Sequence, residues 1–200
     1  MRIAVLGWGS LVWDPRALHL AGGWQKGGPV LPIEFSRVSD DGRLTLVIDE
    51  RDGTDVPTRY AHSSLADLDL AITDLQEREG TPNRDRIGFA DILHDHNCAR
   101  AQLKHPRACR RIQAWAEEKQ FDAVIWTAIG PRFREKTGEP FSVDAAVGYL
   151  ARLPEQTKAL ALDYIRNAPW DLETPVRKKA MCAFGLSRPT VERPSTALDI

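Results

Sequence analysis

A single carboxylate falls on what the sequence otherwise predicts to be the buried face of a helix. Four apolar residues recur at the helical spacings of three and four: Leu65, Leu68, Ile72 and Leu75. Glu79 is the next position in that rhythm, whereas its neighbour Arg78 falls outside the arc. Partial burial and the negative end of the helix dipole both disfavour a charged carboxylate, which suits a general acid or base. The alternative is that the last turn frays and Glu79 turns to water.

A glycine-containing loop follows the first apolar run of the chain. It begins at Gly7 and continues through Trp8, Gly9, Ser10 and Leu11. A G-x-G-x-x-G dinucleotide fingerprint is not completed, because the sixth position is a valine. The paired glycines still leave backbone N–H groups free to converge on an anion or a carbonyl oxygen. The alternative is a tight turn after an edge strand.

The loop and the acid together resemble motifs of the gamma-glutamylcyclotransferase-like superfamily. Residues 8–15 (WGSLVWDP) are similar to that family's Tyr-Gly-Ser-(Leu/Asn) loop, and most of all to the ChaC-type form, in which a Trp and a Pro follow. Residues 75–79 (LQERE) are similar to the family's Leu-x-x-Arg-Glu helix. The likeness extends loosely over residues 2–170, but only the loop and the acid are specific.

The resemblance implies an enzyme with Glu79 as its general acid and base. The amine of a γ-glutamyl amine or peptide would attack its own γ-carbonyl, close the 5-oxoproline ring and expel the second amine. Residues Trp8, Gly9, Ser10 and Leu11 would bind the substrate, with the backbone N–H groups of 9–11 holding its carboxylate or the developing oxyanion. Neither a metal nor an organic cofactor is implied.

Trp8 departs from the family pattern, which usually has Tyr at this position. An indole donates one hydrogen bond and accepts none, whereas a phenol does both. If the phenol binds substrate in relatives, this chain is expected to prefer another substrate. The alternative function is a non-catalytic small-molecule binding module on the same fold.

Three further candidates carry chemistry of other kinds. On a strand, His94, His96 and Cys98 would share a face, but no fourth zinc ligand is evident nearby, which favours a polar loop. Arg37 either pairs with a substrate carboxylate or is a surface arginine at a strand end. Cys109 falls on the apolar face of a predicted helix, which indicates a core position.

The sequence predicts most of its strands in the first half of the chain and most of its helices in the second half. Strands are predicted at 3–6, 30–38, 43–48, 58–62, 88–93 and 121–129, and helices at 64–79, 106–119, 142–153, 154–168 and 175–184. An Asp-Gly turn predicts a hairpin between 30–38 and 43–48, and residues 14–29 are interpreted as a long loop. Ser64 and Asp67 resemble a capping box. This order favours an α+β class, and the resemblance implies a mixed β-barrel flanked by helices.

Composition and charge exclude several classes of protein. A chain of 200 residues, 42% hydrophobic and 28% charged, fits one globular domain (1–186) followed by a loose tail (187–200). Its net charge of -1 argues against a binder that neutralises nucleic-acid phosphates and favours a small-molecule partner. Three widely spaced cysteines, no apolar run of membrane-spanning length and no signal peptide predict a cytoplasmic protein without a membrane partner. The oligomeric state is not determined by these features.

Overall fold

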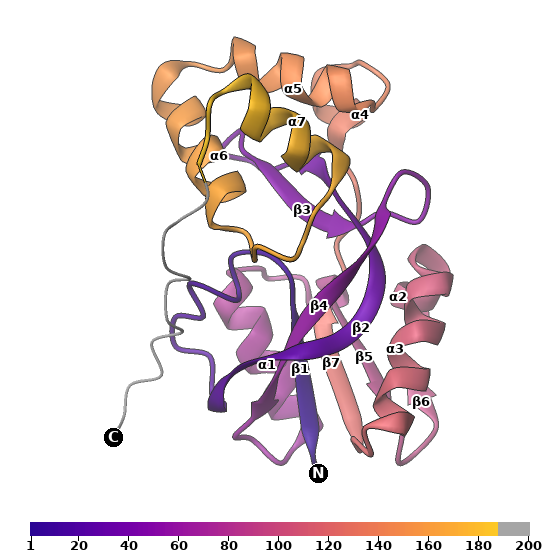
Figure 1. The fold of residues 1–200 in the computed structure, drawn as a ribbon. Coiled ribbons are helices and arrows are strands. Elements are labelled where there is room, and N and C mark those ends of the chain that lie inside the picture. Colours follow the sequence, from indigo (N-terminus) through magenta and orange to yellow (C-terminus); the bar gives the residue numbers. More distant parts are fainter. Residues whose placement is uncertain (188–200) are drawn as a thin grey trace.

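The structure, a computed structural model, describes residues 1–187. Its centre is a seven-stranded mixed sheet in the order β3-β2-β4-β1-β7-β5-β6, flanked by helices (Figure 1). The strands are β1 (Ile3–Gly7), β2 (Leu20–Val38), β3 (Leu44–Ile48), β4 (Thr54–Ser63), β5 (Ile87–Asp91), β6 (His96–Asn97) and β7 (Ala123–Thr127). The α+β class is confirmed. The sheet is open, with β3 and β6 as its edge strands, so the described residues do not form the closed barrel that the resemblance implied.

The helices lie in three groups around this sheet. They are α1 (Leu68–Glu79), α2 (Ala99–Lys104), α3 (Pro106–Glu118), α4 (Phe133–Thr137), α5 (Val143–Arg152), α6 (Glu155–Asn167) and α7 (Pro175–Ala183), with a 3-10 turn η1 (Arg84–Arg86). In Figure 1, α4 to α7 gather at the end of the molecule that holds β3, and α1 lies across the central strands from α2 and α3. No helix within residues 1–187 is both long and apolar enough to span a membrane.

β1 is buried on both faces, which explains why its sequence is a continuous apolar run. It pairs in parallel with β7 and antiparallel with β4. Because side chains alternate across a strand, Ile3 and Val5 pack with the apolar face of α1, whereas Ala4 and Leu6 face the larger core that includes residues of α3. The strand therefore ends, at Gly7, between two cores, and the loop that follows begins there.

β2 corrects the expected loop over residues 14–29. The strand begins at Leu20 and passes through its glycine-rich half as a bent ribbon paired with β4. Gly22 and Gly27 have φ angles of 85° and 88°, and the pairing register shifts on either side of Gln25 and Lys26. Glycine adopts such angles at little cost, so these residues bend the strand at bulges where the sequence pattern had indicated a break.

The helix that carries Glu79 is shorter at its start than expected. It begins at Leu68, and the side chain of Asp67, not Ser64, accepts the Leu70 N–H as N-cap. Gly80 ends it in the left-handed conformation, as expected. The short helices α2 and α4 were not predicted. Of the predicted tail, 187–200, all but residue 187 lies outside the described residues.

Candidate functional site

A cavity of about 260 Å³ opens where distant segments of the chain meet. The loop after β1 supplies one wall, and the last turn of α1 supplies another. The hairpin of β2 and β3, the end of β7 and one residue of α6 complete it. Its lining is Leu6, Gly7, Trp8, Gly9, Ser10, Leu11, Arg16, Arg37, Ser39, Arg43, Thr45, Leu46, Arg78, Glu79, Thr127, Ile129 and Tyr164. The predicted acid and the predicted loop thus line one cavity.

The last turn of α1 holds Glu79 in place. The Gly80 N–H bonds back to the Glu77 carbonyl and the Thr81 N–H to the Gln76 carbonyl, which closes the helix end without fraying. The Glu79 side chain is 20% exposed. Its Oε1 accepts a 2.6 Å hydrogen bond from Arg78 Nη1, whereas Oε2 makes no hydrogen bond to any residue that the structure describes. One carboxylate oxygen is therefore oriented and the other is available to a bound molecule.

Arg78 is a residue of the site that the sequence interpretation missed. Its side chain is only 6% exposed, so the expectation that it lies outside the buried arc of α1 was wrong. The guanidinium donates to the Asp14 carbonyl at 2.6 Å and reaches Ser10 Oγ at 3.4 Å. The loop packs over this side of the helix and widens the buried arc. A signal was present, because Ala71, Leu75 and Arg78 follow one another at spacings of four and three.

The loop that lines the cavity is anchored by its own side chains. Trp8 packs in the larger core and Leu11 in the core that α1 covers. Backbone bonds from Val12 N–H to the Gly9 carbonyl (3.0 Å) and from Asp14 N–H to the Ser10 carbonyl (2.8 Å) fold the segment into successive turns. The predicted substrate-binding residues, 8–11, thus lie together on one side of the cavity, in a loop folded by hydrogen-bonded turns.

Tyr164, on α6, is the second residue that the sequence interpretation missed. Burial raises the pKa of its phenol, and the nearby backbone of Ser10 and of Leu46 opposes that shift. The backbone of Ser10, expected to face substrate, thus lies beside the Tyr164 phenol. A Cβ on Gly9 would lie 2.5 Å from the Tyr164 hydroxyl, so the loop needs glycine here to approach α6. No local pattern near the loop indicates a partner so far along the chain.

Four arginines and one carboxylate give the cavity a cationic lining. Arg16 pairs with Asp14, Arg43 pairs with Asp41, and Arg78 pairs with Glu79. Arg37 also reaches the cavity, as a half-buried side chain and not as the surface arginine that was its alternative. Such a lining favours ligands that carry negative charge.

The other candidate residues lie away from this cavity. His94 is in a turn, with Nδ1 2.9 Å from Asp91 Oδ2. Cys98 occupies the N-cap position of α2, without a side-chain capping hydrogen bond, so the strand face expected to hold His94, His96 and Cys98 does not form. Among residues 1–187, no cluster of three His, Cys, Asp or Glu side chains is placed to hold a metal. Burial raises the pKa of Cys109 to about 12, which leaves it a protonated thiol near neutral pH.

Comparisons with protein-family models, with curated proteins and with solved structures returned no match for this chain. The family resemblance therefore rests on the two sequence motifs, residues 8–15 and 75–79.

Proposed function

We propose that the chain is a gamma-glutamylcyclotransferase-like enzyme that converts a γ-glutamyl amine or peptide to 5-oxoproline and releases the amine. One observation carries the proposal: Glu79 and the 8–11 loop, some seventy residues apart, line the same cationic cavity. A general base, the 8–11 loop and arginines for a substrate carboxylate then lie around one small cavity. Positioning matters most in such a reaction, because nucleophile and electrophile belong to one molecule.

In the proposed reaction Glu79 moves the first of two protons. Its free Oε2 takes a proton from the α-ammonium group, and the resulting amine attacks the γ-carbonyl carbon to form the ring C–N bond. The C–N bond to the second amine then breaks as Glu79 returns that proton to the departing nitrogen. The ring nitrogen loses a second proton, which completes the leaving ammonium ion. Arg78 acts as a positioning residue, because its bond to Oε1 orients the carboxylate.

The direct test is release of 5-oxoproline from a panel of γ-glutamyl amines and peptides by wild type and by Glu79→Gln. The variant is nearly isosteric but neither accepts nor returns a proton, so kcat is expected to fall about 10²- to 10⁴-fold. Substrate affinity and Tm are expected to change little.

Glu77→Gln is the matched control, because Glu77 is two residues away on the exposed side of the same helix. It is expected to keep full turnover. Equal activity of wild type and Glu79→Gln would contradict the proposal.

A second candidate function, a non-catalytic binding module, is favoured by the Arg78–Glu79 ion pair and by Trp8. The pair occupies one oxygen of the carboxylate, and the indole lacks the acceptor of the family's phenol. Wild type would then release no 5-oxoproline across the panel, while γ-glutamyl compounds would still raise its Tm.

A further inference from the structure

Arg37 differs from the other arginines of the cavity because it has no acidic partner among residues 1–187. It lies near the end of β2, next to a register shift in the pairing with β3 that begins at Glu34. Bulges of this kind turn a side chain away from the regular alternation of the strand. The guanidinium donates from Nη1 to the Gly130 carbonyl at 3.1 Å, and no carboxylate of residues 1–187 lies within ion-pair distance of it.

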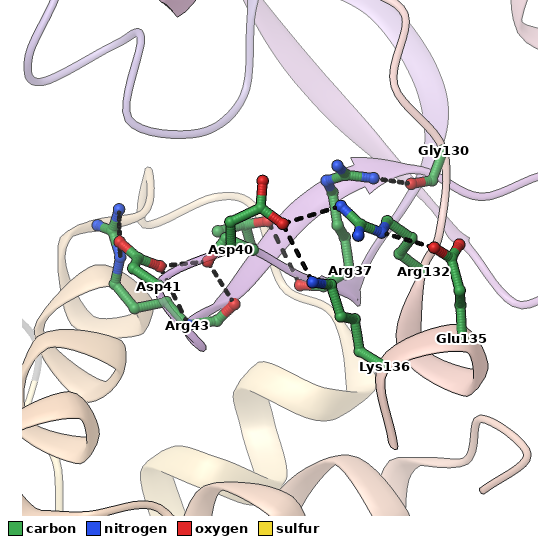
Figure 2. Close-up of polar contacts among 10 residues, drawn as sticks. Arg37, Asp40, Asp41, Arg43, Gly130, Arg132, Glu135 and Lys136 are labelled. Atoms are coloured by element: carbon green, nitrogen blue, oxygen red, sulfur yellow. Dashed lines mark hydrogen bonds and ion pairs between the residues drawn. The ribbon is translucent and has the colours of Figure 1, made fainter. Parts of the chain in front are cut away.

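The two acids near Arg37, Asp40 and Glu135, form ion pairs with other cations, as Figure 2 shows. Asp40 pairs with Arg132 at 3.2 Å and with Lys136 at 3.1 Å, and Glu135 pairs with Arg132 at 3.2 Å. Burial lowers the pKa of Arg37, and the charges of Arg132 and Arg86 lower it further. A half-buried cation beside other cations, with most of its five N–H donors unused, is a place where a bound anion is strongly stabilised.

The α-carboxylate of a γ-glutamyl substrate is expected near Glu79 and not at Arg37. The α-carboxylate is attached to the same carbon as the α-amine, which must reach Glu79 for proton transfer. It therefore lies close to Glu79, beside the Arg78 guanidinium and the 8–11 loop. Arg37 contacts Gly130, on the segment after β7, and neither Arg78 nor Glu79. Arg37 reaches the cavity from β2, whereas Arg78 and Glu79 reach it from α1, so Arg37 is available to a second anion.

We propose that Arg37 is a specificity-determining residue, which binds an anionic group on the leaving amine and so selects γ-glutamyl peptides with a free carboxylate over neutral γ-glutamyl amines. The inference rests on the proposed function. It predicts a substrate with two anionic ends, one near Arg78 and one at Arg37.

The test compares γ-glutamyl-alanine with γ-glutamyl-ethylamine, which differ only by the carboxylate of the leaving amine. Wild type is expected to prefer the first, and Arg37→Gln to lower kcat/KM for it about 10- to 100-fold, mainly through KM, as for the loss of one hydrogen-bonded charge pair. The same variant is expected to change kcat/KM for γ-glutamyl-ethylamine less than about twofold. Arg37→Lys keeps the charge but loses the planar fork, so an intermediate loss is expected.

Arg134→Gln is the control, because it removes one positive charge from α4 without lining the cavity. It is expected to leave the ratio between the two substrates unchanged. An equal loss on both substrates with Arg37→Gln would overturn the proposal and assign Arg37 to the α-carboxylate. No loss on either substrate would overturn it outright.

Failure of the proposed reaction can be distinguished from failure of the role proposed for Arg37. If wild type turns over neither compound, the reaction is wrong, and calorimetric binding of the same two compounds then tests Arg37 alone. Tighter binding of γ-glutamyl-alanine that Arg37→Gln abolishes would support the anion site. Equal binding of the two compounds, or binding of neither, would overturn it.

Discussion

At the scale of single residues, the site depends on a close approach between Gly9 and Tyr164. The hydroxyl of Tyr164, on α6, lies where any side chain on residue 9 would be, and the backbone of Ser10 and of Leu46 is close to it. Trp13 and Phe35 contact the same ring edge-on. The shape of the loop is therefore set by a residue from another part of the chain.

Gly9→Ala is expected to destabilise the fold by about 1–3 kcal/mol, because the new methyl group must displace the Tyr164 hydroxyl. Adding Tyr164→Phe removes the atom that clashes, so the double variant should lose less than the two single losses combined. Urea denaturation of all four proteins measures the coupling. Gly23→Ala is the control, because a Cβ there meets no atom within 4 Å and no strain is expected. Strictly additive losses would contradict the contact.

At the scale of elements, α1 positions Arg78 and Glu79, which are its last two residues. Its N-cap at Asp67 sets where the helix starts, and Gly80 sets where it stops. His19 ties the chain before β2 to the middle of the helix, through backbone and ring hydrogen bonds to the Asp74 carboxylate. The positions of Arg78 and Glu79 in the cavity therefore depend on where α1 begins and ends.

Asp67→Ala is expected to lower the free energy of unfolding by about 0.5–2 kcal/mol, because the Leu70 N–H loses its capping acceptor. Ser64→Ala, at the start predicted from sequence, is expected to change it by less than about 0.5 kcal/mol. Its backbone N–H bonds the His19 carbonyl whichever side chain is present. Chemical denaturation compares the two, and the reverse order of losses would return the start of the helix to Ser64.

At the scale of the whole molecule, His105 joins elements on the side of the sheet that α3 covers. It is the one residue between α2 and α3 in the chain, its side chain is buried, and Gly130, the hydrogen-bond partner of Arg37, lies close to its ring. Burial lowers the pKa of His105, and the neighbouring Lys104 charge lowers it further. A protonated ring at this position would be a buried charge near the Arg37 site.

The lowered pKa of His105 makes the stability of the fold depend on pH. Because the folded pKa of His105 lies below the unfolded value of 6.5, the unfolded chain binds the proton first as the pH falls. The stabilisation is complete above pH 6.5 and is lost as the pH drops through the folded pKa. As the pH falls below 6.5, the free energy of unfolding of wild type should therefore decrease more steeply than that of His105→Gln. His96→Gln, with an exposed ring, serves as control, and parallel curves for wild type and His105→Gln would contradict the expectation.

Much of the local structure could be predicted from the sequence, because local interactions decide it. The apolar run of β1, the Asp-Gly hairpin, the Gly80 stop and the helices over 106–118 and 143–152 all lie close to their expected positions. Where the expectation failed, a second interaction outweighed the local one. Glycines bent β2 at bulges, and a loop covered the side of α1 that holds Arg78.

The sequence by itself determined that an acid ends an apolar helical stripe and that a glycine loop ends the first strand, since both patterns depend only on neighbours a few residues apart. Only the tertiary structure decided that Arg37 and Tyr164 join them around one cavity. The packing of α6 on β3 and the pairing of β1 with β7 bring these segments together. Such contacts depend on how whole faces of strands and helices bury their apolar surface, which no single stretch of sequence specifies.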